Sequence, residues 1–277
     1  MAFKTILAIT AINQSDRDLR LVADLCDETL AHMSVLVLAF AAPPPVGEYA
    51  AMASAGWAEE READLKRLEE RIAAVTSFLA ARETSADIAS EYPEIAWADE
   101  VIGRRARCVD LTLIGPELLA TKTLKAKTIE GALFSSGRPL LLVPEGAQPA
   151  LRPKRVLVAW DGRIEASRAL RESLDLLVSA NEVRLVLVDP AESELGAEPG
   201  ADAATYLARH GIKVTVDRLP RSGHTVADVL RRHAVDMAAE LLVMGAYGHS
   251  RLRERIFGGV TKSMLDEPPP LPILMAR

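Results

Sequence analysis

The residues of this chain whose types and spacing favour chemistry lie near its C-terminus, in the stretch LLVMGAYGHSRLRERIFGGVTKSMLD at positions 241–266. An apolar run ends at Gly245, Gly248 follows, and after nine further residues Gly258 and Gly259 open a segment with helical spacing of its apolar residues. This order predicts a strand, a loop and a helix. Unpaired N–H groups at the start of such a helix, its dipole, and glycines that allow close backbone approach all favour a bound phosphate.

Glycine spacing by itself is a weak motif, so a purely structural interpretation stays open. In that interpretation Gly245 and Gly248 form turns, Gly258 begins a helix, and no ligand is involved. The context favours the phosphate loop, because the first glycine ends a buried type of strand and the last opens a helix, as parallel α/β domains require.

The run GAYGHSRLRERIFGG resembles the nucleotide loop of the universal stress protein family, in which Gly, two residues, Gly, nine residues and Gly precede Ser or Thr. The chain departs from that pattern at Gly259, which stands where the family has the hydroxyl residue. The resemblance implies an adenine nucleotide, ATP with or without Mg²⁺, as the partner of the C-terminal half. The residues that it implies as nucleotide contacts are Ala159, Asp161, Val188, Met244, Gly245, Tyr247, Gly248, Gly258, Gly259 and Val260.

Within this set, the glycines are expected around the phosphates, and Val188 and Met244 against the base. Asp161 follows the first predicted strand of this half, at the position where universal stress proteins contact the adenosine part of the nucleotide. Its carboxylate is equally suited to cap the following helix, and Val188 is equally suited to a plain core. Arginines between the second and third glycines either neutralise phosphates or face bulk solvent. They are Arg251, Arg253 and Arg255.

The elements that must position these residues alternate between strand and helix, and their order occurs twice. Short apolar runs predict strands at 5–10, 34–41, 86–90, 109–114 and 140–143, and again at 155–160, 183–188, 213–216, 241–244 and 272–275. Helical spacing predicts helices at 16–30, 57–82, 94–107 and 127–135, and again at 165–177, 203–210 and 225–239, with a last helix opened by Gly258 and Gly259. Asn13 or Ser15 is expected to cap the first helix.

The repeated order is an internal duplication, most plainly where ADEVIGRRARCVDLTLIG compares with ADVLRRHAVDMAAELLVMG. Alternating strands and helices imply right-handed crossovers and a parallel sheet covered on both faces. With the resemblance, the expected fold is two tandem Rossmann-like domains of the adenine nucleotide alpha hydrolase-like type. Each is a five-stranded parallel sheet in the order 3-2-1-4-5, at residues 1–147 and 153–277. The two fifth strands are expected to pair with each other across the domain interface, and the chain to form a homodimer.

The two halves differ chemically. After its fourth strand the first half has Gly115, Pro116 and Glu117, so the second glycine is missing, a backbone donor is lost, and a negative charge stands where phosphate would bind. Ala11 occupies the region that corresponds to Asp161. Residues 1–150 carry 15 Lys and Arg against 22 Asp and Glu, and the remainder 18 against 17. An anionic ligand is therefore expected in the second half alone.

Composition excludes several classes of partner. A formal net charge of −6 and 4% aromatic residues argue against a nucleic acid or an anionic membrane surface as the main partner. The two cysteines are too few for a disulfide framework, and no apolar window has the length of a membrane span. We expect a cytoplasmic protein.

No enzyme signature occurs in the sequence. A Ser nucleophile elbow, a Walker lysine, a Rossmann fingerprint after the first strand and a zinc motif are all missing. Two hypotheses follow. The first is a tandem universal stress protein that binds ATP in its C-terminal half and regulates a stress response with at most slow hydrolysis. The second is an interaction module of the same fold that has lost nucleotide binding.

Overall fold

The computed structural model describes residues 3–47, 50–190, 198–248 and 259–277. Its contacts divide the chain into two compact units, Phe3–Arg138 and Pro139–Arg277, which we call the N-terminal and C-terminal units. This boundary falls before the predicted fifth strand of the first domain, because that strand pairs within the C-terminal unit. None of the helices that the structure describes combines the length and apolar character that a membrane crossing needs.

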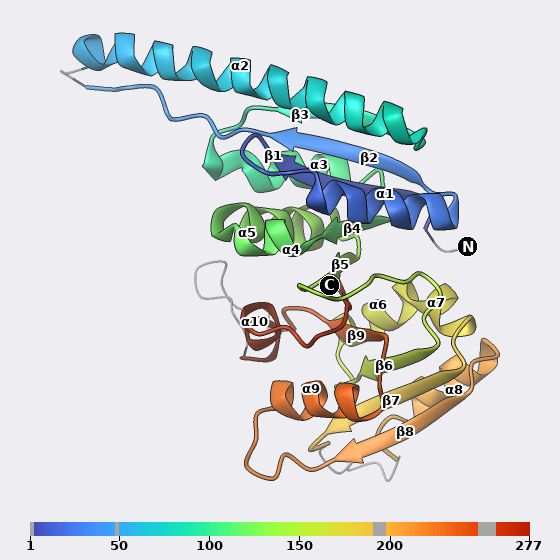
Figure 1. Ribbon diagram of the computed structural model, residues 1–277. Coiled ribbons are helices and arrows are strands. Elements are labelled where there is room, and N and C mark those ends of the chain that lie inside the picture. Colours follow the sequence, from blue (N-terminus) through green and yellow to red (C-terminus); the bar gives the residue numbers. More distant parts are fainter. Residues whose placement is uncertain (1–2, 48–49, 191–197, 249–258) are drawn as a thin grey trace. The chain divides into compact units, whose positions relative to one another are not determined.

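In the N-terminal unit the strands run parallel in the order β3-β2-β1-β4 (Figure 1). This order agrees with the sequence prediction. The strands are β1 (Thr5–Ala11), β2 (His32–Leu38), β3 (Ala86–Glu91) and β4 (Leu111–Ile114). Nearly every residue of β1, β2 and β4 is buried, as is typical of parallel strands covered on both faces, whereas β3 at the edge is largely open.

Helices cover both faces of this sheet. Arg82 at the end of α2 pairs with Asp24 and Asp27 of α1, so these two helices share one face. Lys127 of α5 pairs with Asp99 of α3 on the other. The helical segments are α1 (Arg17–Thr29), α2 (Ala50–Arg82), η1 (Ile95–Trp97), α3 (Ala98–Ala106), α4 (Pro116–Ala120), α5 (Lys122–Glu130) and the π-helical turn η2 (Gly131–Ser136).

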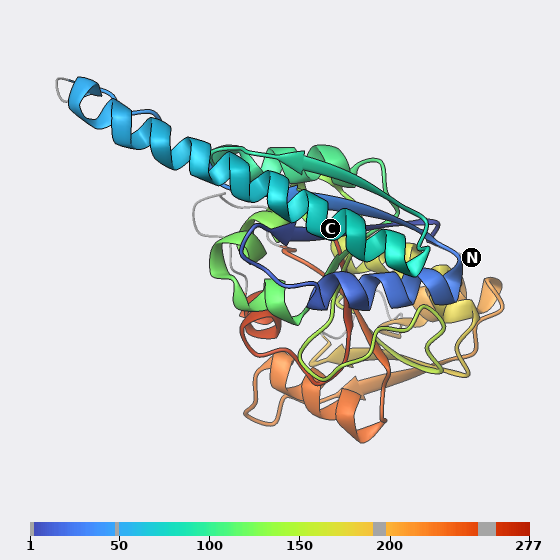
Figure 2. The same cartoon turned by 45° about the horizontal axis from the view of Figure 1, so that its top comes forward.

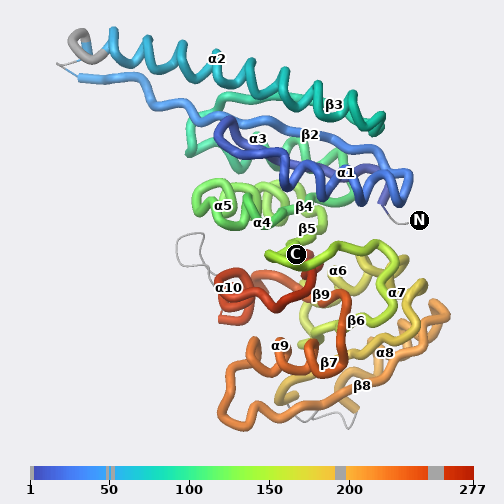
Figure 3. Tube along the Cα trace, viewed as in Figure 1, coloured from blue at the N-terminus to red at the C-terminus, as the bar shows by residue number. Residues whose placement is uncertain are grey.

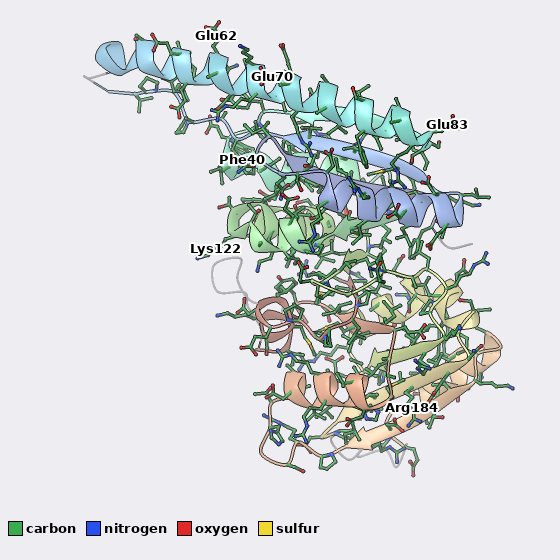
Figure 4. All side chains as sticks on the ribbon, in the orientation of Figure 1. Phe40, Glu62, Glu70, Glu83, Lys122 and Arg184 are labelled. Atoms are coloured by element: carbon green, nitrogen blue, oxygen red, sulfur yellow. The ribbon has the colours of Figure 1, made fainter. Side chains whose placement is uncertain are left out.

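The longest helix, α2, extends beyond the end of the sheet that it covers (Figure 2). Its exposed surface is charged, and Glu62 and Glu70 lie on it (Figure 4). From its inner side Arg71 reaches the carboxyl end of β1, where its guanidinium donates to Asp16 Oδ1 at 2.6 Å, Ser15 O at 2.8 Å and Thr10 Oγ1 at 3.1 Å.

In the C-terminal unit the strands β8-β7-β6-β9-β10 are parallel, which confirms the predicted order 3-2-1-4-5 (Figure 3). Beyond β10 lies β5, antiparallel, with Leu141 opposite Leu274. The predicted pairing of the two fifth strands is therefore present. The strands are β5 (Leu140–Leu142), β6 (Arg155–Ala159), β7 (Glu182–Val188), β8 (Val214–Leu219), β9 (Leu241–Gly245) and β10 (Ile273–Ala276).

The helices of this unit are α6 (Ile164–Glu172), α7 (Leu174–Val178), α8 (Ala201–Arg209), α9 (Val226–Asp236) and α10 (Gly259–Asp266). Arg231 of α9 joins the last two helices by donating to Ser263 O at 2.6 Å and to Glu267 O at 2.7 Å. Thr225 and Asp228 form a capping box that fixes the start of α9.

Two predicted helices differ from the structure, and one short helix was not predicted. The expected helix 165–177 is split at Ser173, which is buried and donates its hydroxyl to Leu170 O. Pro116 begins the short helix α4, which suits its fixed φ. At the first helix Asp16, and not Asn13 or Ser15, holds the N-cap position, and its carboxylate accepts from Arg71. Ser15 Oγ does accept from Arg17 N, the first N–H of α1, at 3.2 Å.

Candidate functional site

The cleft of interest is built by the C-terminal unit at the carboxyl ends of its strands. It has a volume of about 550 Å³, within the usual range for small-molecule sites. The ends of β6, β7 and β9 and the first residues of α10 line it. Ligands of doubly wound sheets settle at this edge because the strand order reverses there, here between β6 and β9.

The structure brings the predicted site residues together. All of them except Gly258 line this one cleft: Ala159, Asp161, Val188, Met244, Gly245, Tyr247, Gly248, Gly259 and Val260. Gly258 lies outside the described residues, as do Arg251, Arg253 and Arg255 of the same loop.

Gly245 is required by helix packing. A Cβ at this position would lie 2.5 Å from Ala166 N and 2.6 Å from the carbonyl carbon of Glu165, both backbone atoms in the first turn of α6. Among the described residues of this loop, Tyr247 has a positive backbone φ, at 59°. Neither Gly245 nor Gly248 has a positive φ, so backbone conformation does not require glycine at either position.

The other two described glycines of this loop, Gly248 and Gly259, are less closely packed than Gly245. A Cβ on Gly248 would come within 3.3 Å of Glu165 Oε2 and 3.4 Å of Arg163 Cδ, which are atoms of movable side chains. A Cβ on Gly259 would meet no atom of the described residues within 4 Å. Gly259 also begins α10, and the first N–H groups of a helix have no acceptor within it.

Thr261 holds the glycine loop to α10. Its Oγ1 accepts from Tyr247 N at 3.2 Å, and its side chain is buried. Sequence reasoning missed this residue, although a hydroxyl two positions after Gly259 was a visible signal. Because this hydroxyl binds the loop, it does not stand in for the one that Gly259 lacks.

Asp161 forms a tight turn with the two residues that follow it. Its Oδ1 accepts from Arg163 N at 3.0 Å, and Gly162 between them has φ 75°. Arg163 holds the N-cap position of α6, so the prediction of Asp161 as the N-cap is wrong by two residues. Asp161 Oδ2 lies 3.7 Å from Arg163 Nε, and both side chains are about half exposed.

The apolar end of the cleft lies at β7 and β9. Val188 and Met244 contribute to it, as predicted, together with residues that the sequence did not single out. These include Val186, Leu187, Pro190, Pro199, Val226 and Leu230. Among the described residues of the whole chain, no cluster of three or more His, Cys, Asp or Glu side chains is suited to a metal ion.

The N-terminal unit fills its corresponding position with its own carboxylate. Asp18 of α1 accepts from Leu118 N at 2.8 Å and from Glu117 N at 3.1 Å, at the start of α4. A Cβ on Gly115 would collide with this carboxylate, just as one on Gly245 would collide with Ala166. Burial raises the pKa of the Asp18 carboxyl above its ordinary value, and the two backbone hydrogen bonds oppose that rise.

Comparisons with known proteins agree with this architecture. A sequence model described as the universal stress protein family matches residues 153–275. Universal stress protein Slr1230 of Synechocystis is 31% identical over 156 residues, which cover 54% of this chain and 50% of that protein. The chain thus spans about half the length of this relative.

Solved structures share the fold over nearly the whole chain. A universal stress protein from Archaeoglobus fulgidus has a TM-score of 0.58 at 18% identity, with 99% of this chain and 96% of that chain covered. A structure described as a universal stress protein from Pseudomonas aeruginosa has a TM-score of 0.60 at 14% identity, with 99% and 93% covered.

Proposed function

Because this chain belongs to the universal stress protein family, we propose that it binds an adenine nucleotide once per chain, in the cleft of its C-terminal unit. ATP, with or without Mg²⁺, is the proposed ligand, and regulation of a stress response is the proposed role. Hydrolysis is at most slow, so the nucleotide acts as a regulatory ligand.

In this proposal the phosphates lie against Gly248 and the first turn of α10, where backbone N–H groups and the helix dipole favour an anion. The nucleoside lies toward Asp161, with the base against Val188 and Met244. The single observation that carries the proposal is the convergence of these residues, from three strand ends and one helix start, on one cleft of about 550 Å³.

The N-terminal unit is proposed to bind no nucleotide. Its corresponding N–H groups, on Glu117 and Leu118, already donate to Asp18. A phosphate would have to displace a buried carboxylate that belongs to the chain. One site per chain is therefore expected.

Two substitutions in the glycine loop test the proposal by calorimetric titration with ATP. Gly259→Ser supplies the hydroxyl that the family has, at a position where no atom of the part of the chain that the structure describes lies within 4 Å of the added Cβ, and is expected to tighten binding by about 10- to 150-fold. Gly248→Val is expected to abolish binding, because a β-branched side chain would stand where the phosphates approach the backbone.

The matched control is Gly56→Val, which adds the same side chain at a glycine of α2 with no atom within 4 Å of its Cβ position. This control should leave the ATP affinity unchanged. Unchanged affinity in Gly248→Val as well would show that this loop does not hold the nucleotide.

A second candidate is an interaction module that has lost the nucleotide. Two observations favour it: Gly259 lacks the hydroxyl, and three carboxylates line the cleft, those of Asp161, Glu165 and Asp189. Mass spectrometry of small molecules released from the purified protein separates the candidates. A stoichiometric adenine nucleotide supports the first, and its absence together with no binding of millimolar ATP supports the second.

A further inference from the structure

The described side chains that line the cleft carry more negative than positive charge, which disfavours an anionic ligand. Its described lining residues include three carboxylates, and Arg163 is the only cation among them. One of these carboxylates already has a local hydrogen bond, since Asp189 Oδ1 accepts from the backbone N–H of Arg221 at 3.2 Å. Among the described lining residues, this guanidinium alone carries the positive charge that attracts a phosphate chain.

Arg163 lies between the two ends of the proposed nucleotide site. Its Nε is 3.7 Å from Asp161 Oδ2, on the nucleoside side. Its Cδ and Nη1 are 3.4 and 3.5 Å from the Cβ position of Gly248, on the phosphate side. The turn at Gly162 fixes the backbone from which this side chain projects. Its side chain is 47% exposed.

Glu165 occupies the same region with the opposite charge. Its Oε2 is 3.3 Å from the Cβ position of Gly248, so the carboxylate and the guanidinium both face this glycine. A phosphate bound against Gly248 is attracted by Arg163 and repelled by Glu165. The two residues act on the same ligand group with opposite sign.

We propose that Arg163 is the residue that makes the cleft prefer a nucleotide to a nucleoside, by binding the phosphates against Gly248, and that Glu165 limits this preference. The assignment rests on the proposed function. A guanidinium suits the role because its planar N–H groups bind two phosphate oxygens at once.

The experiment titrates the full-length chain with two probes, adenosine and ATP, and compares the ratio of their dissociation constants. Arg163→Gln should weaken ATP binding by about tenfold, the value for loss of one exposed charge-assisted hydrogen bond, and leave adenosine binding unchanged. Glu165→Gln, an isosteric change, should tighten ATP binding and again leave adenosine unchanged. Arg168→Gln is the matched control, because Arg168 is exposed on the same helix and does not line the cleft.

The opposite signs expected for two neighbouring substitutions separate a charge effect from a general loss of structure. If the unmodified chain binds both probes but the ATP-to-adenosine ratio is the same in Arg163→Gln, the assignment is overturned while the proposed function stands. An equal effect of Arg168→Gln would also overturn it, because the effect would then come from net charge. If the unmodified chain binds neither probe at millimolar concentration, the proposed function fails, and the assignment with it.

Discussion

Replacing Gly245 by alanine adds one carbon atom at the closest helix-to-strand approach of the glycine loop. The new Cβ would lie 2.5 Å from Ala166 N and 2.6 Å from the carbonyl carbon of Glu165. Ordinary carbon contacts are about 3.5–4.0 Å, so α6 and β9 must separate by about 1 Å. Overpacking costs about 1–3 kcal/mol, and because both obstructing atoms are backbone we expect a loss of about 3 kcal/mol.

Urea unfolding measures this loss. Trp160 lies in the C-terminal unit and reports on it selectively when Trp57 and Trp97 of the other unit are replaced by phenylalanine. With an m value of about 2 kcal/mol per molar urea, a loss of 3 kcal/mol lowers the midpoint by about 1.5 M.

The matched control is Gly259→Ala, which adds the same atom where none of the residues 3–47, 50–190, 198–248 and 259–277 comes within 4 Å of it. Its stability should change by less than about 1 kcal/mol. Equal midpoints for Gly245→Ala and the unmodified chain would refute the assignment of this glycine to helix packing.

Three further predictions concern other parts of the chain. Burial raises the pKa of the Cys26 thiol to about 12, whereas Cys108 is exposed. A thiol reagent at pH 8 should therefore label Cys108 alone in the folded protein and both cysteines in urea. Labelling of both cysteines in the folded protein would contradict the burial of Cys26. Replacing Arg71 by Met removes its hydrogen bond to Asp16 and two others. Urea unfolding should show that the N-terminal unit loses about 2–3 kcal/mol of stability. An unchanged midpoint would show that these hydrogen bonds do not contribute to the free energy of unfolding. The chain is predicted to form a homodimer at micromolar concentration, and a strictly monomeric mass in light scattering would exclude it.

The sequence predicted the strands well because most of them are short apolar runs with punctuation on both sides. The start of α9 could also be predicted from the sequence, because its capping box is formed by residues that are three positions apart. The break at Ser173 was out of reach, since it depends on the burial of one small polar residue among apolar neighbours. The compact units divide before β5 and not in the predicted linker, because the pairing of β5 with β10, which the sequence did predict, places β5 in the C-terminal unit.

For the site, glycine spacing and the family resemblance were enough to select residues that meet at one cleft. They did not reveal what each glycine does. Gly245 is constrained by the backbone of α6, a contact that no local pattern encodes. Arg163 and Glu165 were missed because their positions depend on the turn at Gly162 and on the approach of Gly248 from another strand. Asp18 was missed for a similar reason, since its partners are about a hundred residues away.

The most direct test of the central proposal is a calorimetric titration of the unmodified full-length chain with ATP. We predict binding at a single site per chain, because the cleft of the C-terminal unit is open while Asp18 occupies the corresponding position of the N-terminal unit. Two equivalent sites per chain, or no heat of binding at millimolar ATP, would contradict the account.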